Sequence, residues 1–189
     1  KVLTQDAGLY LAFISYQPES SRSRKYSAKD QYTEADFVAV TLDFSGDGYS
    51  AYDFVTTLGG GSMDGVTTRG GEYDADWEGP WDFAIGETEA YWVSEIFIPW
   101  TLVPFPVDRE TVDETVKLHF SRYVIAKGEQ YSFPDTSASK ADFLQKMQAF
   151  KVNRRQDSAF SLFPYLSRAA GEAIGHRCRG EIPKHEFAS

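Results

Sequence analysis

Two short apolar segments and the turn between them decide the fold: FVAVTLDF (residues 37–44), SGDG (45–48) and YSAYDFV (49–55). Both apolar segments are rich in β-branched and aromatic residues, which is typical of β-strands. Glycine and aspartate accept the positive φ angles that a tight turn requires, so SGDG predicts the turn of a hairpin. Residues 37–55 therefore predict two antiparallel strands.

Strand patterns recur on both sides of this hairpin. We predict further strands at residues 9–16, 81–85, 91–98 and 116–125. The last of these alternates cleanly, with Val116 on one face and Lys117 on the other. Strands that follow one another without alternating helices predict an all-β protein, an antiparallel sandwich or barrel.

Two other segments differ from this pattern. Residues 58–71 carry many glycines and predict a loop. Residues 141–150 predict one short helix, because Phe143, Met147 and Phe150 recur at a spacing of four and three residues. After residue 152 the chain becomes polar, apart from a further strand candidate at 158–166. We therefore predict a domain at residues 1–152 and a C-terminal extension at 153–189.

Composition excludes several classes of protein. The chain has 189 residues, of which 42% are hydrophobic and 25% charged, the balance of a globular domain. Its net charge of −9 disfavours nucleic acid and anionic membrane surfaces as partners. No apolar run reaches the roughly 18 residues of a membrane-spanning helix. The single cysteine, Cys178, cannot form an internal disulfide bond.

Enzyme signatures are absent from the sequence. It contains no His-Glu-x-x-His motif, no Gly-x-Ser-x-Gly elbow, no Walker loop and no Gly-x-Gly-x-x-Gly motif. His119 falls on the polar face of a predicted strand, where we expect a surface or half-buried side chain. The sequence thus predicts a non-enzyme. A pair of carboxylates in a glycoside hydrolase, or an accessory role in one, stays open.

One segment resembles the start of a calcium-binding loop. Residues 43–48 (DFSGDG) offer oxygen ligands at positions 1, 3 and 5 and glycine at position 6. Position 12 is Phe54, where a bidentate carboxylate is needed, and the flanks predict strands. We therefore favour a hairpin turn for this segment, and the alternative is a calcium ion bound by Asp43, Asp47 or the acids of residues 72–76.

Aromatic rings and acids gather between residues 74 and 82. Trp77 and Trp81 lie four residues apart in DADWEGPWD, among carboxylates, glycine and proline. Indole rings in such a loop can stack on the apolar face of a sugar while carboxylates bind its hydroxyls. The alternative is that the two rings fill the edge of the protein core.

The order of motifs along residues 2–166 resembles one known family. In chain order they are Leu9-Tyr10, Lys29-Asp30, Asp36 before the strand at 37–44, Asp47, Tyr52 and Phe54, Gly61, Asp64-Gly65, Asp76-Trp77, Trp81, Glu95, Ile98-Pro99, Phe120-Ser121-Arg122-Tyr123, Glu129 and Phe163-Pro164-Tyr165. This order is similar to the family 9 carbohydrate-binding-module-like domain. In particular it resembles the version at the N-terminus of bacterial surface proteins that continue into a predicted β-barrel.

The resemblance implies a fold and a setting. The expected fold is an immunoglobulin-like or jelly-roll β-sandwich with one short helix, and the expected partner is a polysaccharide or oligosaccharide. Structural calcium and an extracellular or cell-envelope location are implied in the same way. Residues 153–189 would be the stub of the following barrel, and the family's further N-terminal strand is not seen in this sequence.

Three hypotheses follow from these observations. In the first, the chain is a non-catalytic carbohydrate-binding module, with Trp77 and Trp81 stacking on the sugar and Asp74, Arg122 and Glu129 as hydrogen-bonding candidates. In the second, it is a structural or partner-docking sandwich without a sugar site. In the third, it is a redox module whose haem is held by His119, Met63 or Met147.

Overall fold

The computed structural model describes residues 1–102, 111–136, 142–155, 167–168 and 174–175. The chain divides into two compact units, Lys1–Asp157 and Ser158–Ser189. In the second unit, β12 (Ser167–Arg168) pairs with β13 (Ile174–Gly175). Everything that follows concerns the first unit.

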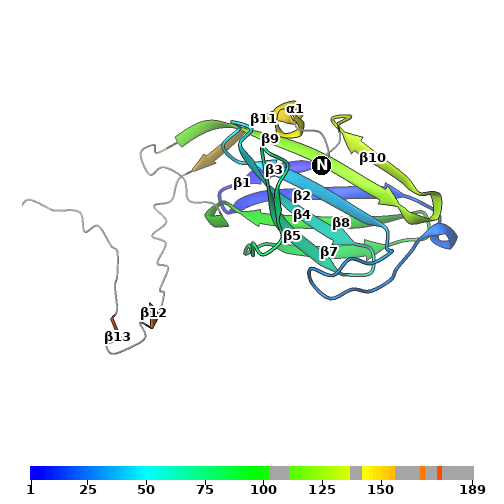
Figure 1. The fold of residues 1–189 in the computed structure, drawn as a ribbon. Helices are drawn as coiled ribbons and strands as arrows, with labels where there is room; N and C mark the ends of the chain where they lie inside the picture. Colours follow the sequence, from blue (N-terminus) through cyan, green and yellow to red (C-terminus); the bar gives the residue numbers. More distant parts are fainter. Residues whose placement is uncertain (103–110, 137–141, 156–166, 169–173, 176–189) are drawn as a thin grey trace, which may run out of the picture. The chain divides into compact units, whose positions relative to one another are not determined.

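Two antiparallel sheets face each other in the first unit (Figure 1). The smaller sheet has the order β1 (Val2–Gln5), β2 (Gly8–Tyr16), β8 (Tyr91–Pro99) and β7 (Asp82–Glu87). The larger sheet has the order β10 (Glu129–Phe133), β9 (Thr111–Val124), β3 (Phe37–Asp43), β4 (Ser50–Thr57), β5 (Ser62–Thr68) and β6 (Tyr73–Asp74). β11 (Gln148–Arg155) pairs with the first half of β9. The architecture is the all-β sandwich that the sequence predicts.

Helical segments are short in the described part of the chain. Three are 3-10 turns: η1 (Glu19–Ser21), η2 (Trp100–Leu102) and η3 (Ile125–Lys127). The one α-helix, α1 (Phe143–Lys146), packs Phe143 and Leu144 against Ala51 of β4. No helix among the described residues is long and apolar enough to cross a membrane.

The hydrophobic core lies between the two sheets. Val40 and Leu42 of β3 pair with Phe120 and Leu118 of β9, and these positions face Leu9, Ile96 and other residues of the smaller sheet. Val40, Leu42 and Leu118 are fully buried. Burial of one alternating face on each sheet is therefore the main stabilising term, as expected for a sandwich.

The predicted hairpin at residues 37–55 is confirmed, since β3 pairs with β4. Three other expectations for this unit are wrong. His119 of β9, expected at the surface or half-buried, is buried and only 5% exposed. Residues 58–71 contain β5, because the glycines at 59–61 form a tight turn that returns the chain along β4. The helix predicted at 141–150 ends at Lys146, and Phe150 lies in β11 opposite Val116 of β9.

Two predictions concern the end of the chain. The predicted boundary after residue 152 falls inside β11, which stays paired with β9 up to Arg155. The strand candidate at 158–166 lies outside the described residues.

Candidate functional site

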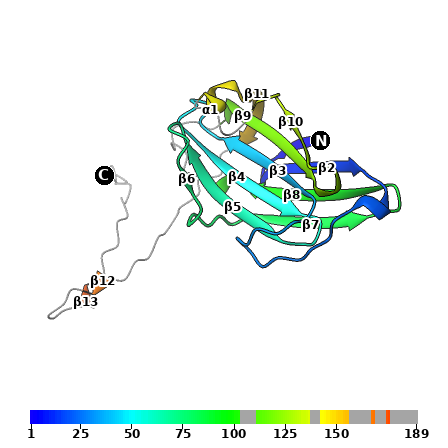
Figure 2. The same ribbon diagram turned by 45° about the vertical axis from the view of Figure 1, so that its right-hand side comes forward.

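A loop at residues 75–81 crosses from one sheet to the other. It follows β6 in the larger sheet and precedes β7 in the smaller sheet. β5 and β6 form one edge of the larger sheet (Figure 2). Because the loop spans both layers at this edge, its side chains can pack against the core from the side.

Trp77 packs against two aromatic residues of β4. Its ring centroid lies 4.8 Å from that of Tyr52 and 6.1 Å from that of Phe54. A Cβ atom at position 79 would clash with the Trp77 indole, so glycine is required there for the ring to lie over the loop backbone. The Trp77 side chain is half-buried.

Trp81 packs on the same phenylalanine and is hydrogen-bonded as well. Its ring centroid lies 5.3 Å from that of Phe54 and 5.7 Å from that of Phe83. Its indole Nε1 donates to Asp64 Oδ2 at 3.0 Å. The two tryptophans thus cover Phe54 at the sandwich edge, both half-buried. This packing agrees with the core interpretation that the sequence left open, and part of each residue's surface stays exposed.

Asp64 of β5 organises the loop. It is 1% exposed, and its Oδ2 also accepts from the backbone N–H of Gly79 at 2.9 Å. Its backbone carbonyl accepts from the hydroxyl of Tyr73. Burial and neighbouring carboxylates raise the pKa of Tyr73 to about 12, which keeps that hydroxyl protonated as a donor. One carboxylate therefore fixes the loop between the two tryptophans.

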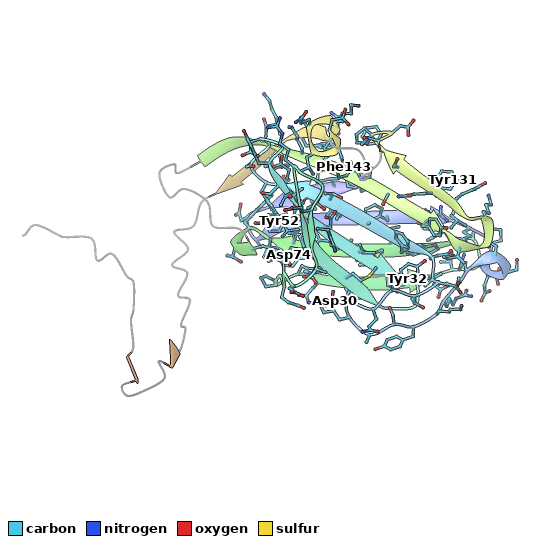
Figure 3. The ribbon with its side chains drawn as sticks, in the orientation of Figure 1. Asp30, Tyr32, Tyr52, Asp74, Tyr131 and Phe143 are labelled. Atoms are coloured by element: carbon cyan, nitrogen blue, oxygen red, sulfur yellow. The ribbon has the colours of Figure 1, made fainter. Side chains whose placement is uncertain are left out.

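A cluster of charged side chains surrounds Asp64. Carboxylate oxygens of Asp30, Asp64 and Glu78 lie within 4.8 Å of one another. The Lys29 ammonium lies 3.2 Å from Asp64 Oδ1 and 4.0 Å from Asp30 Oδ2, and it also pairs with Glu78. Figure 3 shows Asp30 and Asp74 in the same region, beside β5. We name Lys29, Asp30, Asp64 and Glu78 the acid cluster.

The predicted calcium ligands have other partners. Asp43 is fully buried, and its Oδ1 accepts from Ser45 Oγ and Gly46 N while its Oδ2 accepts from Gly48 N, each at 2.8 Å. Asp47 Oδ1 accepts from Tyr49 N at 2.9 Å. The Asp43 carboxylate thus stabilises the hairpin turn. The acid cluster offers three carboxylates, the kind of ligand that calcium prefers, but the Lys29 ammonium already lies among them.

The remaining sugar-binding candidates lie in two separate places. Asp74 is exposed at the end of β6, and its Oδ1 accepts from Asp76 N at 3.0 Å. Arg122 lies on β9 and Glu129 on β10, on the other side of β3, β4 and β5 from the tryptophan loop. Figure 3 shows Tyr131 of β10, the neighbour of both, away from Asp74. The structure therefore brings Trp77 and Trp81 together on Phe54, with Asp74 at the end of the strand before their loop, and places Arg122 and Glu129 elsewhere.

Arg122 and Glu129 have local partners. Arg122 donates to Gln17 Oε1 at 2.8 Å, and burial lowers its pKa. Glu129 accepts a hydrogen bond from the Tyr131 hydroxyl, which lowers the pKa of the carboxyl group. The hydrogen bonds of Arg122 and Glu129 therefore join residues on or next to β9 and β10 and do not reach the tryptophan loop.

The haem candidates do not all lie together. His119 of β9 is buried beneath Phe143, with ring centroids 4.8 Å apart, and Met147 is buried in the same small cluster as Phe143. Met63 lies on β5, with β3 and β4 between it and β9. Burial lowers the pKa of His119, against a hydrogen bond with the Thr136 backbone.

None of the four acid-cluster residues was predicted from the sequence as part of a site. Lys29, Asp30 and Asp64 occur among the motifs that carry the family resemblance, but nothing in their spacing shows that they meet. Residues 29–30 and 64 are brought together by tertiary packing, in which Asp30 N donates to Ser62 O at 2.8 Å. The sequence thus marked Lys29, Asp30 and Asp64 as members of an ordered set of motifs, but it did not indicate that their side chains form a cluster.

Comparison with known proteins supports the fold. A scan against known families finds no match to the sequence, and a search of curated proteins finds none. Among solved structures, the chain is similar to a putative carbohydrate-binding protein from Bacteroides uniformis, with a TM-score of 0.58 and 12% identity over 79% of this chain and 75% of that one.

Two further similar structures are of a family 9 carbohydrate-binding module from Caldicellulosiruptor kristjanssonii. The complex with glucose has a TM-score of 0.52 and 13% identity over 84% of this chain and 78% of that one. The complex with cellotriose has a TM-score of 0.52 and 12% identity over 85% and 76%. The chain thus has a β-sandwich fold like that of family 9 modules.

Proposed function

We propose that this protein is a non-catalytic carbohydrate-binding module whose site is the loop at residues 75–81. The observation that carries the proposal is the pair of half-buried indoles, Trp77 and Trp81, in a loop that Asp64 holds at the edge of the sandwich through Gly79 and Trp81. Both residues keep part of their surface exposed, and a packed aromatic side chain can stack on a sugar with little loss of side-chain entropy. The similarity of the fold to carbohydrate-binding modules supports the same function.

The surroundings of the loop favour neutral glycans. Asp74, Asp76 and Glu78 are exposed beside the tryptophans, and carboxylates accept hydrogen bonds from sugar hydroxyls. The same negative charge, together with the net charge of −9, repels uronic acids and sulfated chains. We therefore expect neutral polysaccharides or oligosaccharides as ligands, in a secreted or cell-envelope protein of which this chain would be a part. Calcium at Asp43 and Asp47 stays a prediction.

Affinity gel electrophoresis on a panel of neutral and acidic polysaccharides tests the proposal. We expect at least one neutral polysaccharide to retard the wild-type protein, and the retardation to be lost in Trp77→Ala. Tyr131→Ala is the matched control, because Tyr131 is an exposed aromatic residue on β10, far from the loop in strand order. No retardation on any polysaccharide would contradict the proposal, as would equal retardation of wild type and Trp77→Ala.

A structural or partner-docking sandwich is the second candidate. The observation that favours it is the packing of both indoles on Phe54. Acrylamide quenching distinguishes the two functions. If Trp77 and Trp81 only fill the sandwich edge, no glycan should change the quenching of tryptophan fluorescence. If they bind sugar, the glycan that retards the protein should reduce it.

A further inference from the structure

The acid cluster holds three carboxylates and one ammonium group at the base of the tryptophan loop. Asp64 is buried, and among the described residues no group donates a hydrogen bond to its Oδ1. The Lys29 ammonium is the charged partner of that oxygen, at 3.2 Å. An unpaired buried carboxylate oxygen is costly, so the ion pair with Lys29 is required for the charge to stay buried.

The cluster is built on an ordered segment. Asp30 has a left-handed backbone with φ 58°, and its N–H donates to the carbonyl of Ser62 on β5. Its Oδ1 accepts from the backbone N–H of Asp64 at 3.3 Å. Lys29 is thereby fixed next to β5, and its ammonium group reaches Glu78, which lies between the two tryptophans in the loop.

We propose that the Lys29 ammonium is the resident cation of this cluster: it fastens the tryptophan loop to β5 in the position that a divalent ion would otherwise take. Three carboxylates with oxygens within 4.8 Å of one another are the ligands that calcium prefers. The ammonium group lies among these oxygens, so Lys29 and a divalent ion exclude each other. The proposal concerns the cluster alone and does not depend on carbohydrate binding.

Removal of the ammonium group should convert the cluster into a divalent-cation site. Lys29→Met keeps most of the aliphatic side chain and leaves three negative charges without their cation. In the presence of a chelator, we expect the variant to unfold at a lower temperature than wild type, because the carboxylates repel one another. Calcium chloride should then raise its unfolding temperature by more than it raises that of wild type.

Thermal unfolding followed by circular dichroism, and calorimetric titration with calcium alone, measure these effects. The calcium affinity of Lys29→Met should exceed that of wild type about tenfold or more, since a unit charge a few ångströms from the ion is removed. Lys25→Met is the control: Lys25 is an exposed lysine of the same segment that pairs with Glu34, and its variant should behave as wild type.

A second variant identifies where the ion binds. Adding Glu78→Gln to Lys29→Met removes one exposed ligand and should abolish the excess calcium response, which a calcium site elsewhere in the protein would not do. Equal calcium responses of wild type and Lys29→Met would overturn the proposal. Retention of the excess response in the double variant would overturn it as well.

Discussion

Two aspartate side chains, Asp64 and Asp43, each accept several hydrogen bonds and thereby hold one loop or turn in place. Asp64 binds the tryptophan loop through Gly79 and Trp81, and Asp43 binds the turn between β3 and β4. Each is almost fully buried. Buried aspartates of this kind cannot be told from exposed ones by sequence alone, because their partners are mostly backbone N–H groups.

Asp64→Asn is predicted to weaken the loop without removing its acceptor oxygen. The amide keeps one oxygen for Gly79 or Trp81 but loses the charge that pairs with Lys29. We expect a loss of about 1–3 kcal/mol in the free energy of unfolding and a red shift of tryptophan emission. Urea unfolding measures the change in the free energy of unfolding. Asp74→Asn, at an exposed position near the loop, should change stability by less than about 0.5 kcal/mol. Equal stabilities of the two variants would contradict this role for Asp64.

Asp43→Ala is predicted to destabilise the hairpin strongly. It removes three hydrogen bonds of the turn and leaves buried backbone donors unsatisfied, which should cost about 2–4 kcal/mol. Asp47→Ala removes one exposed hydrogen bond and should cost about 1 kcal/mol or less. Denaturant unfolding with and without calcium also tests the calcium prediction: a calcium response that wild type has and Asp43→Ala lacks would support an ion there.

At the scale of elements, strands with a strong apolar pattern of their own could be predicted from the sequence. Strands that form mainly because they pair with a neighbouring strand could not. β2, β3, β4, β7, β8 and residues 116–124 of β9 were predicted from their own apolar pattern. β5 was missed because its sequence, SMDGVTT, has few apolar residues and is a strand through pairing with β4. Phe150 fits the helical spacing of Phe143 and Met147, yet its pairing with Val116 places it in a strand. Tertiary contacts decided both cases.

The packing of α1 on β9 predicts a pH dependence of stability. Burial of His119 under Phe143 lowers its pKa below the ordinary value of 6.5. The unfolded chain therefore takes up a proton more readily than the folded protein as the pH falls below about 7. His119 should thus reduce stability progressively from there down to its folded-state pKa.

His119→Gln tests this prediction. We expect the unfolding temperature of wild type to fall more steeply than that of the variant between about pH 7.5 and 5.5. Differential scanning calorimetry across this range measures the two slopes. Parallel slopes would show that His119 makes no contribution to the pH dependence.

For the whole molecule, the sequence was enough to predict the class of fold. It was enough to predict only some of the residues that make up the candidate site. Strands without alternating helices, together with motif order, indicated the sandwich. Trp77 and Trp81 meet on Phe54 because one short loop carries both, and Asp74 lies at the end of the strand before that loop. Arg122 and Glu129 are distant in sequence, and the strand order places them across the sheet from the loop. Strand order is a property of the whole chain, which local patterns do not contain.

The indole N–H signals of a ¹H–¹⁵N spectrum test the central claim most directly, because the chain has four tryptophans. Trp92 and Trp100 are buried, with their indole N–H groups bonded to Gln17 and Gln5, and serve as internal controls. On titration with glucose, cellotriose and fragments of any polysaccharide that retards the protein, we predict that the signals of Trp77 and Trp81 shift while the other two stay. If those two signals stay in place with every ligand, or only Trp92 and Trp100 move, the tryptophan loop is not a carbohydrate site.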